Sequence, residues 1–213
     1  AVDPDKLEET LRAHPDAVIV AFVHAETSTG VCSDVPTLVE IAHRHGCLTI
    51  VDAVTSLGGC ELRVDDWGVD ACYSGSQKCL SCTPGLSPVT FNDRALAKVK
   101  RRATKVRSWF LDLNLVMGYW GPEQRRTYHH TAPVNALYGL HEALVMLHEE
   151  GLERAWARHC RNHLALRAGL EALGLELPVP QPERLPQLNA VAVPAGMDDA
   201  LVRARLLQQY DLE

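Results

Sequence analysis

The stretch VPTLVEIAHRHGCLTIVDA, residues 35–53, decides the fold class. Its first part, residues 35–46, spaces apolar residues as an amphipathic helix does, and it ends at a glycine, which commonly closes helices. Its second part, residues 47–53, is a short apolar run typical of a strand that is buried on both faces. The stretch therefore predicts a helix followed by a strand of a parallel sheet.

The same alternation continues on both sides of this stretch. Residues 3–14 open with Asp-Pro, a typical helix start, and the apolar run 17–23 follows them as a buried strand. Strands are also predicted over residues 69–75 and 86–91, and a capped helix over residues 92–103. Helices that alternate with strands predict an α/β fold, with a mostly parallel sheet and helices on both faces.

The pattern changes after residue 107, where an aromatic-rich stretch and a polar loop follow. The elements expected beyond them are a helix over 134–174 that Gly151 breaks or bends, a strand over 189–194 and a capped helix over 198–210. We expect a domain boundary near residue 150. Residues 1–150 would form a large domain, and residues 151–213 would begin a smaller α+β domain.

Composition excludes several function classes. The net charge of -6 argues against nucleic acid as a partner, because binding phosphates needs a basic face. The longest apolar run, residues 17–23, is too short to span a bilayer, so we expect no membrane partner. The 7 cysteines are scattered and odd in number, which favours a reducing compartment, the cytoplasm. The chain begins without methionine and in mid-domain, so we expect a fragment that lacks both ends.

Two patterns could bind a metal, and we expect that neither does. Cys79 and Cys82 form a C-x-x-C pair, but no second pair completes a zinc site. His159 and His163 lie four residues apart on a predicted helix, a spacing that can hold zinc. Because a zinc site needs three or four ligands, we place this histidine pair at the surface and expect no metal.

The segment SGSQKCL, residues 74–80, surrounds Lys78 with small and apolar residues directly after a predicted strand. Such a lysine either reaches solvent or has a pKa lowered for chemistry. Ligands of parallel sheets bind beyond the carboxyl ends of the strands, where both Asp52 and Lys78 fall. The pair suits pyridoxal phosphate, since its aldehyde needs a lysine amine and its pyridine nitrogen needs a carboxylate to stay protonated.

Four motifs together closely resemble the alanine–glyoxylate and serine–pyruvate aminotransferases, which are class V aminotransferases of the fold type I pyridoxal-phosphate enzymes. They are HAETSTGV (24–31), IVDAVTSLGG (50–59), YSGSQKCL (73–80) and YHHTAPVNALYGL (128–140). The resemblance covers nearly the whole chain. It implies a pyridoxal 5'-phosphate-dependent transaminase that moves an amino group from alanine or serine to glyoxylate or pyruvate. In animals this family often works in peroxisomes or mitochondria.

The resemblance also implies roles for four residues near Lys78. Lys78 would form the Schiff base with the cofactor, and Asp52 would pair with the pyridine nitrogen. Val54 would pack against the cofactor ring, and Gln77 would help to hold its phosphate.

Further implied contacts come from two other motifs. Thr27 stands where the family usually has a serine that approaches the ring, and it keeps the hydroxyl. His24, in the same motif, is a position where the family commonly has a histidine. Tyr128 and Thr131 would reach the phosphate held by the other subunit, which implies a homodimer with shared active sites.

Three alternatives remain open at this point. The 3-hydroxykynurenine transaminases share nearly the same motifs. Cysteine desulfurases share the fold, but they need a mobile catalytic cysteine and usually show His-Lys where this chain has Gln77 and Lys78. A non-catalytic relative could keep the sheet and lose the activity, although the retained Asp52 and Lys78 argue against long decay.

Overall fold

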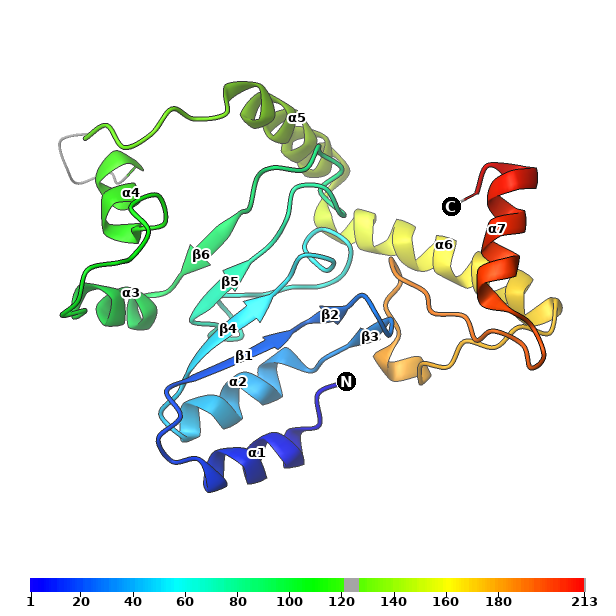
Figure 1. Ribbon diagram of the computed structural model, residues 1–213, viewed down its shortest axis with the longest axis horizontal. Helices are drawn as coiled ribbons and strands as arrows, with labels where there is room; N and C mark the ends of the chain where they lie inside the picture. Colours follow the sequence, from blue (N-terminus) through cyan, green and yellow to red (C-terminus); the bar gives the residue numbers. More distant parts are fainter. Residues whose placement is uncertain (121–126, 213) are drawn as a thin grey trace.

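The computed structural model describes residues 1–120 and 127–212. A four-stranded sheet lies at its centre, in the order β1-β4-β5-β6 (Figure 1). Strands β1 (Ile19–Val23), β4 (Leu48–Asp52) and β5 (Ala71–Tyr73) are parallel, and β6 (Val89–Phe91) runs antiparallel to β5. The predicted α/β class with a mostly parallel sheet is confirmed.

Helices α1 (Pro4–Ala13) and α2 (Val35–Arg44) form as their local sequence signals predict. The Asp3 carboxylate accepts hydrogen bonds from the first free backbone N–H groups of α1, and the Asp34 carboxylate does the same for α2. After α2 the chain reverses at Gly46, whose φ of 75° is costly for any residue with a Cβ atom.

The hydrophobic core lies between these two helices and one face of the sheet. Val39 of α2 packs with Val51 of β4 and Cys72 of β5, and all three side chains are buried. A second cluster joins Leu11 of α1 to Ile41 of α2. Because strand side chains alternate between faces, Asp52 and Tyr73 point away from this core.

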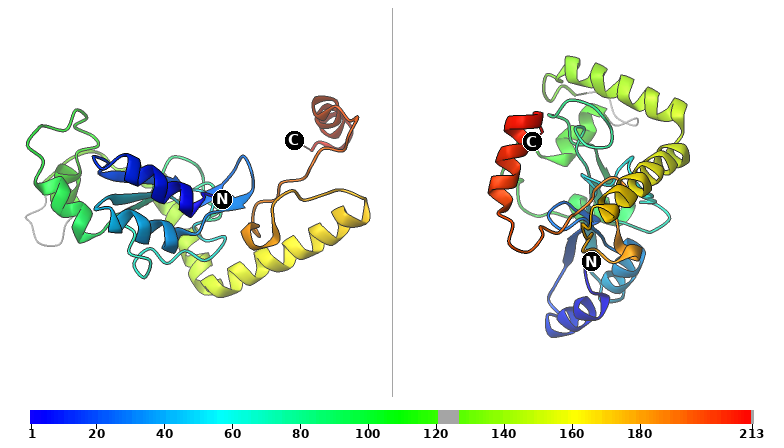
Figure 2. Two further views of the ribbon diagram at one scale, coloured as in Figure 1. Left: turned by 90° about the horizontal axis from the view of Figure 1, so that it is seen from below. Right: turned by 90° about the vertical axis from the view of Figure 1, so that its right-hand side faces the viewer.

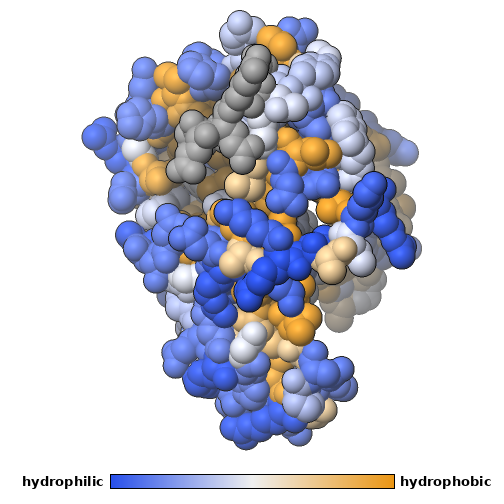
Figure 3. Space-filling model, turned by 90° about the vertical axis from the view of Figure 1, so that its left-hand side faces the viewer, coloured by the Kyte–Doolittle hydropathy of each residue, from blue (hydrophilic) through white to orange (hydrophobic). Residues whose placement is uncertain are grey.

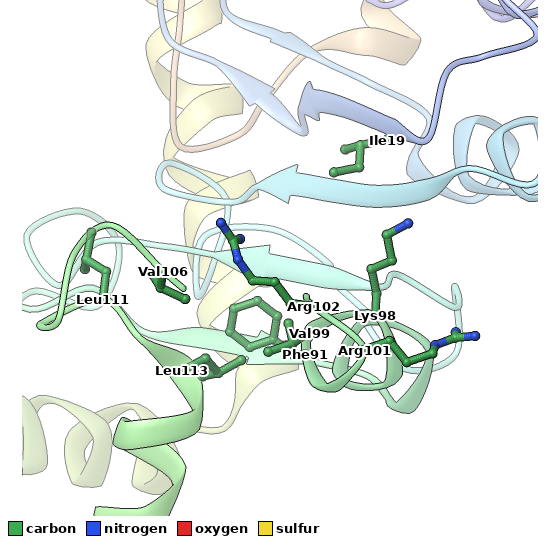
Figure 4. Close-up of a pocket in the computed structure, with 9 residues that line it drawn as sticks. All are labelled: Ile19, Phe91, Lys98, Val99, Arg101, Arg102, Val106, Leu111 and Leu113. Atoms are coloured by element: carbon green, nitrogen blue, oxygen red, sulfur yellow. The ribbon is translucent and has the colours of Figure 1, made fainter. Parts of the chain in front are cut away.

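The other face of the sheet carries more exposed apolar side chains. Ile19 is 48% exposed and Val89 is 58% exposed. Helix α3 (Asp93–Lys100), which Asn92 caps, packs against β6 and leaves a cavity of about 700 Å³ between itself and Ile19 (Figure 4). Figure 3 looks onto the left-hand side of Figure 1, where α3 lies, and shows apolar surface between polar side chains.

A two-stranded hairpin and four further helices complete the described chain. The hairpin pairs β2 (Ala25–Glu26) with β3 (Val31–Cys32), directly after β1. The helices are α4 (Leu113–Trp120), α5 (Val134–Glu150), α6 (Leu152–Ala172) and α7 (Asp199–Tyr210), with a 3-10 turn at Gln181–Glu183. Gly151, at a φ of 85°, separates α5 from α6, so the predicted break is confirmed. Helix α4 was not predicted, because its stretch is apolar without a clear period.

The chain after α6 turns back toward the hairpin. Figure 2 shows α6 extending away from the sheet and the following segment returning. The backbone of Arg184 forms an isolated antiparallel β-bridge with the backbone of Val31 in β3. Among the described residues no helix is long and apolar enough to cross a membrane.

Two expectations for this part of the chain were wrong. The predicted strand over 189–194 does not form, because an alternating apolar pattern makes a strand only where a neighbouring strand supplies hydrogen bonds. Val191 and Val193 instead lie exposed, at 40% and 50%. His163 is not a surface residue: it is buried, and its ring bonds to the amide oxygen of Asn189.

Candidate functional site

The carboxyl ends of three parallel strands meet at one edge of the sheet. Val23 of β1 pairs in register with Asp52 of β4, and Asp52 pairs with Tyr73 of β5. Each strand passes directly into a loop that carries predicted site residues. This edge is where ligands of parallel sheets bind, and we take it as the candidate site.

Both oxygens of the Asp52 carboxylate are held in place. Oδ1 accepts a hydrogen bond of 2.8 Å from the backbone N–H of Val54, and Oδ2 accepts one of 2.7 Å from the Tyr73 hydroxyl. The hydrogen bond to Asp52 raises the pKa of Tyr73, so this phenol stays a donor. Asp52 has no Lys or Arg within ion-pair distance among the described residues, which leaves it available to a cationic ligand group.

His24 lies beside Asp52 as a buried, neutral imidazole. Its backbone N–H donates to the Asp52 carbonyl at 2.9 Å, and its ring packs edge-on against Trp67. Burial lowers the pKa of His24 to about 4. Its Nδ1 atom is buried without a hydrogen-bond partner among the described residues.

Lys78 lies on a turn that buried serines anchor. The Ser74 hydroxyl donates to the carbonyl of Ala53, at 2.9 Å, and the Ser76 hydroxyl donates to the carbonyl of Thr83, at 2.6 Å. Lys78 itself is exposed, and its ammonium makes no hydrogen bond or ion pair with any other described residue. The structure therefore fixes the backbone of this turn and presents the amine to solvent.

Gln77 lies beside Lys78 on the same turn and is also exposed. A Cβ atom on Gly75 would come within 2.7 Å of the Gln77 side-chain oxygen, so the Gln77 side chain lies over Gly75. The amide therefore lies across the backbone of the turn, where it could donate to a ligand.

The loop after Asp52 and the turn that carries Lys78 are packed together. The Cys79 thiol, next to Lys78, donates a weak hydrogen bond of 3.8 Å to the carbonyl of Thr55. A Cβ atom on Gly58 would lie 3.3 Å from the Cys79 carbonyl oxygen. The loop that begins after Asp52 is thus in direct contact with the turn that carries Gln77 and Lys78.

Thr27 comes from the β2–β3 hairpin and is exposed. The adjacent Glu26 carboxylate shapes the hairpin by accepting bonds from the N–H and hydroxyl of Ser28. The Thr55 hydroxyl ties the hairpin to the loop after Asp52 with a 2.6 Å bond to the carbonyl of Ala25.

Tyr128 and Thr131 lie on a different part of the molecule. Their hydroxyls share a hydrogen bond of 2.8 Å, and both residues are exposed. The ring of Tyr128 contacts Tyr119 of α4. Figure 1 shows this segment beside α4, apart from the loop that follows β5. The chain does not bring this pair to its own Lys78.

Two contributors to the site were missed in the sequence. Tyr73 could have been found, because a strand residue one place before SGSQK lies opposite Asp52 in a parallel pair. Gln187, whose amide reaches Thr55 at 2.9 Å, gave no signal, since 132 residues separate the two. The cavity beside α3 is not part of the site, because none of its lining residues comes from these loops.

Comparisons with known proteins identify the family. The family described as Aminotransferase class-V matches residues 1–211. Alanine–glyoxylate aminotransferase of Callithrix jacchus is 42% identical over 210 residues, which are 98% of this chain and 50% of that protein. (S)-Ureidoglycine–glyoxylate transaminase of Bacillus subtilis is 38% identical, over 99% of this chain and 54% of that protein.

A solved structure of alanine–glyoxylate aminotransferase from Nostoc sp. superposes with a TM-score of 0.93 at 47% identity. The match covers 98% of this chain and 55% of that one. The chain thus spans about half the length of the curated relatives it matches. The resemblance carried by the four motifs is confirmed: the chain belongs to the class-V aminotransferase family.

Proposed function

We propose that the protein is a pyridoxal 5'-phosphate-dependent transaminase that moves an amino group from alanine or serine to glyoxylate or pyruvate. One observation carries the proposal. An anchored carboxylate, Asp52, ends β4 at the carboxyl edge of the sheet, where the loop that follows it contacts the turn that carries Lys78. The Lys78 amine is exposed and has no partner among the described residues. The family match supports this reading, and it does not favour 3-hydroxykynurenine transamination or a non-catalytic role.

The donor set fits the cofactor. Pyridoxal phosphate requires an amine for its aldehyde, an acceptor for its protonated ring nitrogen and donors for its phosphate. Lys78 supplies the amine, Asp52 the acceptor, and the Gln77 amide a phosphate donor. Thr27 and Val54 would contact the ring.

The chemistry divides between the cofactor and two side chains. When bound, pyridoxal phosphate supplies the electron sink that makes loss of the substrate's α proton feasible. Asp52 would keep a proton on the ring nitrogen, because an ionised carboxylate favours the charged form of a neighbouring base. Lys78 would act as the Schiff-base lysine and, once free, would carry the α proton as general base.

The dimer is part of the same proposal. The hydroxyls of Tyr128 and Thr131 are hydrogen-bonded to each other at the surface, away from Lys78 of their own chain. This placement supports a role in the site of a second copy, where both hydroxyls would reach the phosphate. Residues 1–150 would form the cofactor domain, and residues 151–213 would begin the smaller domain.

The substrate class and the compartment complete the proposal. Both curated relatives are named for glyoxylate, so glyoxylate is the acceptor that we would test first. Small amino acids and 2-oxo acids are the proposed substrates. We place the protein in the cytoplasm, on the scattered and odd-numbered cysteines.

Borohydride trapping tests the proposal. The complete open reading frame that contains this chain is incubated with pyridoxal phosphate and reduced, and peptide mass spectrometry then locates the adduct. We expect one adduct, on Lys78, that disappears in Lys78→Ala and persists in the matched control Lys105→Ala. Adducts scattered over several lysines, or none on Lys78, would refute the assignment.

A further inference from the structure

The segment that returns after α6 contacts two of the three loops at the candidate site. Arg184 forms a backbone β-bridge with Val31 of the hairpin. Ala190 packs close to Gly30 of the same hairpin, where a Cβ atom would lie 3.2 Å from it. Between these two contacts, Gln187 reaches the loop that follows Asp52. Residues 184–190, which are far from the site in sequence, are therefore in direct contact with two of its loops.

The Gln187 amide holds that loop at two atoms. Nε2 donates 2.9 Å to the carbonyl of Thr55 and 3.4 Å to the sulfur of Cys60. The same Thr55 carbonyl accepts from the thiol of Cys79, and the Thr55 hydroxyl donates to Ala25. Thr55 is thus the point where the hairpin, the loop after Asp52, the Lys78 turn and the returning segment meet.

Gly59, in the same loop, has no room for a side chain. A Cβ atom on Gly59 would lie 2.6 Å from the Cys79 sulfur and 2.8 Å from Cγ of Gln187. Real Cβ atoms do not approach so closely, so Gln187 and Cys79 close against the same glycine from two sides. A shift of Gln187 would therefore also loosen the packing of Cys79, the residue next to Lys78.

We propose that Gln187 is a positioning residue for the cofactor site, which holds the loop after Asp52 and, through Thr55 and Cys79, the turn that carries Lys78. The inference rests on the proposed function above. Loops that follow strands lose conformational entropy when a ligand orders them, and a bond that orders them beforehand removes this cost from binding. Gln187 touches no reacting atom, so its effect would be on cofactor affinity and on the environment of Lys78.

The test compares two glutamines of the same segment. Gln187→Met keeps the length of the side chain and removes the donor, while Gln181→Met changes an exposed glutamine of the 3-10 turn. In the complete open reading frame, we expect Gln187→Met to weaken pyridoxal phosphate binding by about fivefold to tenfold, the equivalent of one hydrogen bond. The pH midpoint of the visible absorbance of the bound cofactor should shift, and Gln181→Met should match the wild type.

A cofactor-free measurement separates this inference from the proposed function. We expect iodoacetamide to alkylate Cys79 faster in Gln187→Met than in the wild type, because the turn is released. If Lys78 fails to trap the cofactor but Cys79 is alkylated faster, the proposed function fails and the structural tie stands. If affinity, pH midpoint and alkylation rate all match the wild type, or if only the melting temperature changes, Gln187 has no positioning role.

Discussion

The phenol of Tyr73 donates a hydrogen bond of 2.7 Å to Oδ2 of Asp52, from the neighbouring parallel strand. The two residues are in register, so the pairing of β4 with β5 sets this contact. The backbone N–H of Val54 occupies the other oxygen. The carboxylate therefore has a fixed orientation before any ligand binds, which is the preorganisation that an electrostatic contact to a cofactor needs.

Replacing Tyr73 by phenylalanine should loosen Asp52 without removing its charge. We expect Tyr73→Phe to weaken pyridoxal phosphate binding by about threefold to tenfold, less than is usual for a bond to a charged group because Tyr73 is 40% exposed. Fluorescence titration of the cofactor measures the change. Tyr210→Phe on α7 is the matched control, since that tyrosine is exposed and belongs to none of the loops of the site. Equal affinities of the two variants would contradict the role of the bond.

Asp70 is a buried carboxylate that joins β4 to the start of α3. Its carboxylate is fully buried and accepts bonds from the N–H of Thr49, from Asn92 and from His43, with Arg94 at 3.3 Å. Burial alone would raise the pKa of Asp70, but the hydrogen bonds from Asn92, His43 and Thr49 outweigh it and lower the pKa. We expect Asp70→Asn to reduce the free energy of unfolding by about 3 kcal/mol, measured by urea denaturation at pH 7.

The pH dependence of the same variant gives a second check. A carboxylate with a lowered pKa in the folded state stabilises the protein above its unfolded pKa, about pH 4, and the stabilisation is lost as pH falls further. Asp70→Asn should therefore show a flatter loss of stability below about pH 4 than the wild type. An unchanged slope would mean that Asp70 binds as many protons in the folded state as in the unfolded state.

His24 should make the folded state sensitive to mild acid. Because burial lowers its pKa from 6.5 to about 4, the unfolded chain binds a proton between these values and the folded chain does not. Stability should then fall as pH drops from 6.5 to 4, by about 1.4 kcal/mol per unit at the steepest. In His24→Phe, which retains a ring against Trp67, the slope over this window should flatten. Denaturant titrations at several pH values measure both slopes. Equal slopes for the wild type and the variant would rule out a buried neutral histidine at this position.

Gly59 has no room for a side chain. A Cβ atom there would lie 2.6 Å from the Cys79 sulfur, so Gly59→Ala should force apart the loop after Asp52 and the Lys78 turn. We expect a loss of about 1–3 kcal/mol in the free energy of unfolding. Gly169→Ala is the matched control within α6, where nothing lies within 4 Å, and it should stabilise by up to about 1 kcal/mol. Destabilisation of both variants alike would argue against a tight junction at Gly59.

Local signals in the sequence determined the elements that hold the site. The caps at Asp3 and Asp34 and the break at Gly151 were predictable, because such residues act on the backbone next to them. The apolar run before Asp52 predicted a buried strand for the same reason. Asp52 and Lys78 were predicted to lie at one edge of the sheet, because the carboxyl ends of parallel strands meet there. The order of the four motifs indicated the family.

Only the tertiary structure decided how these residues are supported. The bond from Tyr73 to Asp52 depends on the register of two strands, and the bond from Gln187 to Thr55 joins residues 132 positions apart. The pattern over 189–194 predicted a strand that lacks a neighbour, and the spacing of His159 and His163 concealed that only His163 is buried. The physical reason is the same in each case. Periodicity and capping report on nearby backbone, whereas burial and long-range hydrogen bonds depend on which distant segment packs alongside.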